Sequence, residues 1–416
     1  MENFLVHNEE TKKEMLNEIG MNSIDELFAQ IPQKAVPVNF EKDLGKAKSE
    51  MEVQKLVKSL ANKNNTSYES FLGGGSYNKF IPACVNQTAS RWEFLTAYTP
   101  YQAEISQGTL QVMYEFQTMM CRLTGMDIAN ATVYDGATAC AEAILMASRI
   151  SKKTKALVHT GLNPEYRKVV NTYAWAKNIE VVEFSQDLPA DLSEFACVLI
   201  QTPDYTGEIL KTPVLTDTLL VVCTNLSALS VLEPPKNADI LVGDVQSLGI
   251  PQSFGGPYAG VIACKEKYMR QISGRLAGRT VDANGNTAYC LTIQTREQHI
   301  KREKATSNIC SNQALIGLCA TLYLTVMGEV GFKQAGFLSA KYAHLLAQKL
   351  QNKGIKVLTK NFFNEFVFEV PNADETLKIL KENGILGGIK ISDTKILTAT
   401  TEMNTEENIE KFANLV

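Results

Sequence analysis

Short apolar runs alternate with longer amphipathic stretches along the chain from about residue 155 onward. Such runs, when bounded by Gly or Pro, are typical of buried strands, and the stretches between them have helical periodicity. This alternation predicts an α/β domain with a mostly parallel sheet and covering helices. The expected strands are 156–159, 180–184, 197–201, 219–224, 240–243 and 261–264, and the clearest helix between them is 164–176.

The pattern changes toward both ends of the chain. Residues 1–70 are polar with helical periodicity, and they lack the apolar positions that a core of their own would need. Beyond the predicted sheet, two long helices (311–327 and 331–353) lead into a smaller unit of alternating strands and helices. We therefore expect three parts, namely an N-terminal helical extension (1–70), a large domain (71–325), and a connecting helix with a small C-terminal α/β domain (326–416).

Two glycine-containing stretches precede the predicted sheet. Asp135-Gly136-Ala137-Thr138 opens an alanine-rich helix, with Asp135 as its expected N-cap. Gly73-Gly74-Gly75 follows no predicted strand and lacks the GxGxxG spacing of a dinucleotide loop. We interpret this triplet as a flexible turn.

Composition places the chain among ordinary soluble proteins. Its 416 residues are 45% hydrophobic and 21% charged, and the net charge of −4 argues against a nucleic-acid-binding protein. Residues 1–5 lack the order of a secretory signal, and the longest apolar run, near 219–222, is far shorter than a membrane span. We therefore expect a cytoplasmic protein that binds neither nucleic acid nor membrane.

The cysteines and histidines indicate neither a disulfide framework nor a metal site. The nine cysteines form no CxxC pair, and Cys197, Cys223 and Cys264 lie inside apolar runs. We interpret them as reduced core residues. The four histidines are far apart in sequence and lack metal-ligand spacing, so no metal site is predicted.

Four longer motifs carry a more specific signal. They are TAYTPYQAEISQ at 96–107, YDGATA at 134–139, QSLG at 246–249 with FGGP at 254–257, and QTREQHIKREKATSNICSN at 294–312. Together they resemble the glycine cleavage system P-protein family, and more narrowly the alpha (N-terminal-half) subunits of its two-subunit members. The resemblance covers nearly the whole chain. It implies the fold of type I pyridoxal-phosphate enzymes, and a reaction that decarboxylates glycine and passes its aminomethyl group to the lipoyl arm of the H-protein.

Pyridoxal-phosphate enzymes need three kinds of group from the protein. A lysine forms the Schiff base, a carboxylate keeps the ring nitrogen protonated, and a helix N-terminus with small residues holds the phosphate. Gly136, Ala137 and Thr138 meet the third need in part, although an ordinary helix start explains the same residues.

The other two needs are not met. The resemblance to the catalytic subunits of the family places Gln246 where their lysine lies and Val222 where their ring carboxylate lies. Glutamine cannot form a Schiff base, and no lysine occurs between Lys236 and Lys265. We therefore expect that this chain binds no pyridoxal phosphate covalently. The vestigial pocket is then marked by Gly136, Ala137, Thr138, Val222 and Gln246.

The resemblance implies a subunit that works with partners. We expect the non-Schiff-base subunit of a heteromeric glycine decarboxylase, beside a second subunit that carries pyridoxal phosphate, with glycine and the lipoylated H-protein as further partners. No catalytic residue is assigned to this chain. Tyr98 and Tyr101, on an extended proline-containing segment, can reach a partner's active site, with a packed aromatic pair as the alternative. The run Arg296–Lys304 is expected to be a solvated face, with a docking surface for an acidic carrier as the alternative.

Three other hypotheses fit parts of the sequence. A self-sufficient pyridoxal-phosphate transferase or lyase would need an unexpected lysine such as Lys265. A nucleotide-binding dehydrogenase would need a strand–GxGxxG–helix unit, which the sequence lacks. A purely structural scaffold would leave the partner's active site unaffected.

Overall fold

The computed structural model describes residues 7–32, 45–95, 98–307 and 309–416. The first residues, where no secretory signal is expected, lie outside the described residues, as do three positions (96, 97 and 308) of the motifs. The chain separates into two compact units, Met1–Thr66 and Ser67–Val416, and each is described by itself.

The N-terminal unit consists of short helices that begin at capping residues. Its elements are α1 (Glu9–Glu18), the 3-10 helix η1 (Ile24–Phe28) and α3 (Glu50–Ala61). Asn8 accepts a hydrogen bond from the Thr11 N–H in α1, and Ser49 and Glu52 form a capping box in α3. None of the residues in these three elements is buried, so the apolar face of α3 is exposed.

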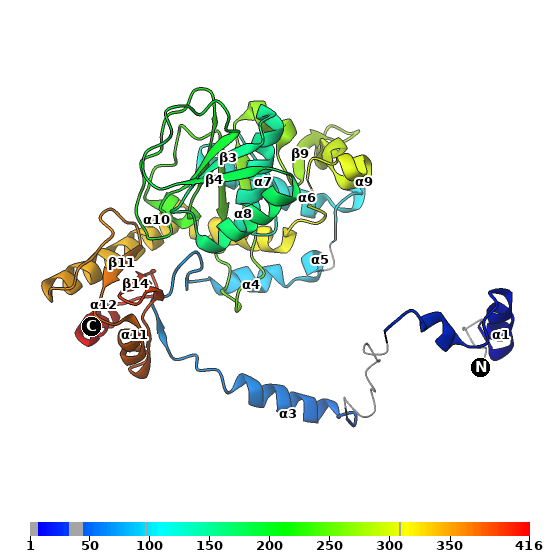
Figure 1. Ribbon diagram of the computed structural model, residues 1–416, viewed down its shortest axis with the longest axis horizontal. Coiled ribbons are helices and arrows are strands. Elements are labelled where there is room, and N and C mark those ends of the chain that lie inside the picture. Colours follow the sequence, from blue (N-terminus) through cyan, green and yellow to red (C-terminus); the bar gives the residue numbers. More distant parts are fainter. Residues whose placement is uncertain (1–6, 33–44, 96–97, 308) are drawn as a thin grey trace. The chain divides into compact units, whose positions relative to one another are not determined.

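A seven-stranded sheet forms the centre of the second unit (Figure 1). Its order is β2–β8–β7–β6–β5–β3–β4, in which β8 runs antiparallel to both of its neighbours and the other pairs are parallel. The predicted mostly parallel sheet is therefore confirmed. The strands are β2 (Ile128–Ala129), β3 (Lys155–His159), β4 (Glu180–Phe184), β5 (Cys197–Gln201), β6 (Leu219–Cys223), β7 (Ile240–Asp244) and β8 (Gly260–Cys264).

Helices cover both faces of the sheet, which explains why its inner strands β5, β6 and β8 are continuous apolar runs. On one face lie α7 (Gly136–Ser151) and α8 (Pro164–Ala176), and every residue of α7 as far as Ala147 is buried. Alanines on α7 allow this close approach to the strands because their side chains are small. The opposite core contains residues of α6 (Gln107–Thr124) and of the long helix α10 (Ala314–Asn352).

A β-hairpin that sequence analysis did not predict follows the sheet. Its strands β9 (Leu276–Val281) and β10 (Thr287–Thr292) are antiparallel. The Asn284-Gly285 pair in its turn is a recognised hairpin signal that could have identified it. Short helices elsewhere in the unit are α4 (Ala83–Ala89), α5 (Trp92–Leu95), α9 (Gln298–Lys301) and the 3-10 helices η3 (Ala103–Ile105), η4 (Leu226–Ser230), η5 (Glu266–Gln271), η6 (Gln294–Arg296) and η7 (Arg302–Lys304).

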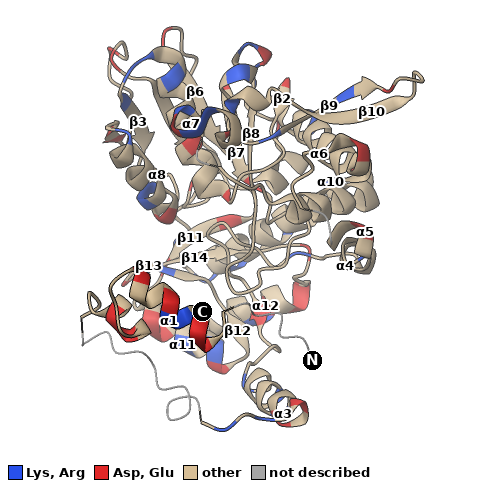
Figure 2. Ribbon diagram, turned by 90° about the vertical axis from the view of Figure 1, so that its right-hand side faces the viewer, with Lys and Arg blue, Asp and Glu red and all other residues tan. Residues whose placement is uncertain are grey.

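The C-terminal part of the unit has its own sheet and core. Strands β11, β14 and β13 form an antiparallel sheet, and β12 pairs in parallel with β1 near the start of the unit. Figure 2 shows acidic residues on α12. The elements are β1 (Glu69–Ser70), β11 (Glu365–Glu369), α11 (Ala373–Glu382), β12 (Ile385–Leu386), β13 (Ile389–Ser392), β14 (Lys395–Ala399) and α12 (Glu406–Leu415).

Helix α10 joins the two cores. Its backbone is non-helical at Gly328 (φ 58°), where the sequence predicts a break between two helices. The expected boundary after residue 325 therefore falls inside α10. By length and composition alone this helix could span a membrane. Because it packs on α4, α6 and α12 and contributes Tyr323 and Leu346 to the cores, we interpret it as a core helix.

Candidate functional site

A small polar cavity lies at the carboxyl ends of β5, β6 and β7, where open α/β sheets usually bind ligands. Gln201, Cys223 and Asp244, the last residues of these strands, line it. Its volume of about 40 Å³ leaves room for roughly three water molecules. The lining also includes the carboxylates of Asp204 and Glu365, so the cavity is acidic.

Asp244 links the end of β7 to the start of α7. Its carboxylate accepts hydrogen bonds of 2.8 Å from the backbone N–H of Gly136 and from that of Gln246. Burial raises the pKa of Asp244 to about 7, against the lowering effect of these two bonds and with a smaller contribution from nearby Asp135. The carboxylate is thus held by the backbone rather than by a basic side chain.

A segment that we call the strap (residues 73–80) contributes Gly74, Gly75 and Tyr77 to the lining of the cavity. The Gly74 N–H donates to Glu365 at 2.5 Å, and the Tyr77 hydroxyl donates to the other oxygen of Glu365 at 2.9 Å. Burial raises the pKa of Glu365 to about 7. A side chain at Gly73 would place its Cβ 2.0 Å from Glu365 Oε1. The glycine triplet is therefore a tightly packed turn, and our interpretation of it as a flexible turn is wrong.

Gln246 fastens the strap to the large sheet. Its side-chain oxygen accepts from the Tyr77 N–H at 2.9 Å, and its side-chain nitrogen donates to the Tyr77 carbonyl at 2.9 Å. The same nitrogen donates to the Ile250 carbonyl at 2.9 Å. The buried amide therefore pairs with one residue of backbone much as a neighbouring strand would. The Gln246 side chain thus acts as a clamp that holds the strap to the loop after β7.

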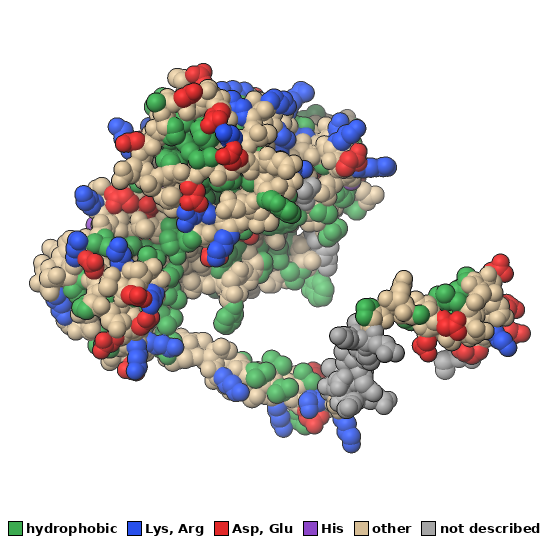
Figure 3. Space-filling view, viewed as in Figure 1, with side chains coloured by type: hydrophobic (Ala, Val, Ile, Leu, Met, Phe, Trp, Pro, Cys, Tyr) green, Lys and Arg blue, Asp and Glu red, His purple; other side chains and the backbone are tan. Residues whose placement is uncertain are grey.

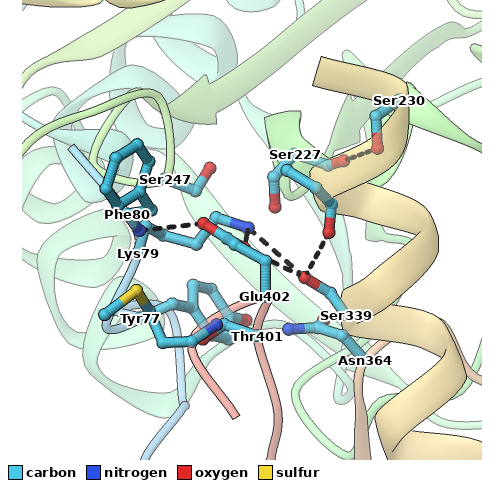
Figure 4. Close-up of polar contacts among 12 residues, drawn as sticks. Tyr77, Lys79, Phe80, Ser227, Ser230, Ser247, Ser339, Asn364, Thr401 and Glu402 are labelled. Carbon is cyan, nitrogen blue, oxygen red and sulfur yellow. Dashed lines mark hydrogen bonds and ion pairs between the residues drawn. The ribbon is translucent and has the colours of Figure 1, made fainter. Parts of the chain in front are cut away.

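A buried ion pair ties the strap to the C-terminal part. Lys79 Nζ lies 2.5 Å from Glu402 Oε2, and the two side chains are only 3% and 8% exposed. Figure 4 shows Lys79 pointing toward Glu402, from the loop after β14, and Ser339, from α10. Glu402 also accepts from the Phe80 N–H at 2.9 Å. The strap is thus bound to the C-terminal part through Glu365 and Glu402, and to the loop after β7 through Gln246.

The five residues expected to mark the pocket are placed around the cavity rather than in its lining. Gly136, Ala137 and Thr138 form the buried first turn of α7, next to Asp244. Gln246 is fully buried behind Tyr77. Val222 lies on the opposite face of β6 from Cys223 and belongs to the core that contains α6 and α10.

The tyrosines expected to reach a partner have different environments. Tyr98 is 81% exposed. Tyr101 is half exposed, and its hydroxyl accepts a hydrogen bond from Arg275 at 3.2 Å while its ring packs edge-on against His299, 4.9 Å between centroids. The structure therefore brings Tyr101 into a local packed cluster and leaves Tyr98 at the surface.

The charged run that begins at Arg296 is divided between core and surface. Arg296 is only 7% exposed and donates to the carbonyls of Ile272, Gly274 and Ile293. The expectation of a solvated face is therefore wrong at its first residue. The following positions from His299 to Lys304 are exposed.

Large apolar side chains are exposed in another part of this unit. Phe254, in the loop after Gln246, is 99% exposed, and Tyr98, Ile105 and Val330 are each exposed to 80% or more. Figure 3 shows hydrophobic side chains along the lower edge of the large lobe, near α4, α5 and the loop between β7 and β8.

The sequence did not reveal which residues line the cavity. Sequence analysis weighed Asp135 as the acid of the α7 start but not Asp244, although Asp244 stands two residues before Gln246 at a strand end. It also missed the strap, because Tyr77, Lys79, Glu365 and Glu402 are too far apart in sequence for any spacing rule.

Comparisons with known proteins identify similar proteins that match nearly the whole chain. A family model of the glycine cleavage system P-protein matches residues 2–416. A protein of Geobacillus thermodenitrificans named probable glycine dehydrogenase (decarboxylating) subunit 1 is 45% identical over 99% of this chain and 98% of its own length. A protein of the same name from Solibacter usitatus is 43% identical over 95% and 93%.

Solved structures give the same result. A glycine decarboxylase (P-protein) of the glycine cleavage system, in inhibitor-bound form, superimposes with a TM-score of 0.87 at 37% identity and covers 100% of this chain and 99% of its own. A sphingosine-1-phosphate lyase of Burkholderia pseudomallei has a TM-score of 0.65 at 12% identity, over 91% of this chain and 93% of its own. This second likeness concerns the fold alone.

Proposed function

The chain belongs to the glycine cleavage system P-protein family, and we propose that it is the subunit of a heteromeric glycine decarboxylase that forms no Schiff base with pyridoxal phosphate. The complex would decarboxylate glycine and transfer the aminomethyl group to the lipoyl arm of the H-protein. The second subunit would carry the cofactor. We also propose that the complex is cytoplasmic.

The observation that carries this proposal is that the Gln246 side chain is fully hydrogen-bonded within the chain. A Schiff base needs a primary amine, and Gln246 offers an amide that is already bound to Tyr77 and Ile250. None of the described residues lining the cavity is a lysine, and about 40 Å³ is far too small for a pyridoxal ring. The residues present therefore do not fit the cofactor.

The exposed apolar residues support a role in a complex. Soluble monomers seldom expose many large apolar side chains near one another, and such surfaces commonly bind another protein. The relatives are named subunit 1, which implies a second subunit in those organisms. We propose that the loop around Phe254 and the segment with Tyr98 contact the second subunit, and that Tyr98 contributes to its active site.

Two alternatives have less support. A self-sufficient enzyme would need another lysine, but Lys265 pairs with Asp239 at 2.7 Å and is not part of the cavity lining. A pure scaffold would assemble without affecting the partner's active site. The exposed Tyr98 favours the first proposal over this one, since the described residues leave its ring 81% exposed.

The proposal can be tested by producing this chain and the second subunit from the same organism, separately and together. The separate chain should show no aldimine absorbance and no exchange of bicarbonate into the carboxyl group of glycine. The mixture should show both, and the H-protein should accept the aminomethyl group. A stoichiometric internal aldimine on the separate chain would refute the proposal.

Tyr98→Phe and Tyr101→Phe distinguish an active-site contribution from a scaffold. We expect Tyr98→Phe to lower the activity of the assembled complex, and Tyr101→Phe to act mainly on stability, because the Tyr101 hydroxyl is bound to Arg275. Full activity of an intact Tyr98→Phe complex would instead favour the scaffold.

A further inference from the structure

We propose that the carboxylate of Asp244 is a built-in anion at the N-terminus of α7, and that this one side chain makes the cavity exclude phosphate groups. The inference concerns the chain's own residues and does not require the proposed function to be correct.

The first turn of α7 is a place where anions are stabilised. The N–H groups there have no partner within the helix, and the helix dipole adds positive potential. Here the Gly136 N–H donates to Asp244 Oδ2 at 2.8 Å, and the Thr138 N–H donates to Asp135 Oδ1 at 2.7 Å. Two of the first three helical N–H groups are therefore already bound to carboxylates of the same chain.

The space beside this turn is also filled. A glycine at the start of a phosphate-binding helix normally lets the ligand approach the backbone. A Cβ added at Gly136 would instead lie 2.6 Å from the hydroxyl oxygen of Tyr166 and 2.9 Å from the Cβ of Asp244. These two side chains occupy the volume that the glycine leaves open.

The surrounding charges act in the same direction. Asp204 and Glu365 line the same cavity as Asp244, and no lysine or arginine is among the described residues of its lining. Above their pKa of about 7, Asp244 and Glu365 are ionised, and a phosphate group would bring further negative charge next to them without any basic side chain to compensate it. Repulsion between like charges is strong away from bulk water.

Asp244→Ser tests the inference in the isolated full-length chain. Serine removes the charge and most of the volume but leaves the first turn of α7 unchanged. The probe is inorganic phosphate, because a cavity of about 40 Å³ has no room for a pyridine ring. We expect Asp244→Ser to bind phosphate at least about tenfold more tightly than the unsubstituted chain, as measured by calorimetry above the pKa of Asp244 of about 7. Hydrogen exchange should slow in peptides that cover the start of α7.

Asp204→Asn is the matched control, because it removes a carboxylate from the same cavity without touching α7. It should gain much less in phosphate binding than Asp244→Ser, because the Gly136 N–H stays bound to Asp244. Equal gains in Asp204→Asn and Asp244→Ser would overturn the inference, since the general acidity of the cavity would then suffice. A folded Asp244→Ser chain with no gain would also overturn it.

Asp244→Asn keeps the inference testable if the serine variant does not fold. This change preserves the size of the side chain and removes only its charge, so we expect a smaller gain in phosphate binding. A folded Asp244→Asn chain that binds phosphate no better than the unsubstituted chain overturns the inference. All of these measurements use the chain without a second subunit, so they leave the test of the proposed function separate.

Discussion

Two regions of the same unit differ in which side chains they bury: the cavity region, and an outer region that contains Tyr98, Ile105 and Phe254. Around the cavity, the polar groups of Gln246 and Lys79 are buried and bound to other parts of the chain. On the outside, the apolar side chains of Tyr98, Ile105 and Phe254 are exposed to 80% or more. In the first region the polar groups have partners within the same chain, whereas in the second most of the apolar surface of these three side chains is left uncovered by the described residues.

This difference indicates where each region acts. Buried polar groups that are fully partnered contribute to stability and to a unique structure, and removing one partner is costly. Exposed apolar groups contribute little to the stability of their own chain but can stabilise a complex. Substitutions in the cavity region should therefore change unfolding, and substitutions in the outer region should change assembly.

The largest effect is expected at the ion pair that holds the strap. Lys79→Ala should lower the free energy of unfolding by about 3–5 kcal/mol, because it leaves Glu402 buried and without its partner. Urea unfolding at neutral pH measures this. Lys333→Ala is the matched control, since its pair with Glu329 is exposed. A change in Lys79→Ala no larger than in the control would contradict the view that the strap is firmly bound.

The next effect is expected at the clamp. Gln246→Ala leaves the backbone groups of Tyr77 and the carbonyl of Ile250 without their partner, so the free energy of unfolding should fall by about 1–3 kcal/mol. Gln246→Lys should be destabilised similarly, and should show no aldimine absorbance and no activity without the second subunit. A competent Gln246→Lys chain would show that the cavity retains more of a cofactor site than its residues indicate.

The parts of the fold that depend on the local pattern of apolar residues could be predicted from the sequence. Six apolar runs predicted the central strands, because buried parallel strands are continuous in hydrophobicity. That Gln246 forms no Schiff base could also be predicted, since glutamine has no primary amine. What Gln246 does instead could not, because its partner Tyr77 is 169 residues away in sequence. Asp244 was missed for the same reason, since only the fold brings it to Gly136.

In the outer region, Phe254→Asp should separate assembly from stability. Placing a charge on a 99% exposed side chain should leave the unfolding of the chain unchanged and weaken binding to the second subunit by about tenfold or more. Binding can be measured by titrating the second subunit. Val214→Asp, at another exposed apolar position between β5 and β6, is the control and should bind normally. Equal weakening by both substitutions would mean that charge rather than location is responsible.

A smaller effect is a dependence of stability on pH to which the cavity region contributes. Burial raises the pKa of Glu365 from an ordinary value of 4.5 to about 7. The folded chain therefore binds more protons than the unfolded chain between these values, and stability falls as the pH rises through the folded pKa. For Glu365 the loss between pH 6 and pH 8 is about 1 kcal/mol, and Asp244 should add a similar loss because burial also raises its pKa to about 7.

Glu365→Gln isolates this contribution. The amide keeps an oxygen for the Gly74 N–H and can donate to the Tyr77 hydroxyl, so the strap should remain bound while the titrating group is removed. Urea unfolding from pH 5.5 to pH 8.5 should then show a shallower loss of stability than in the unsubstituted chain. An unchanged slope would mean that Glu365 does not titrate in this range. Phe254→Asp should leave the slope as it is, because the outer region takes no part in it.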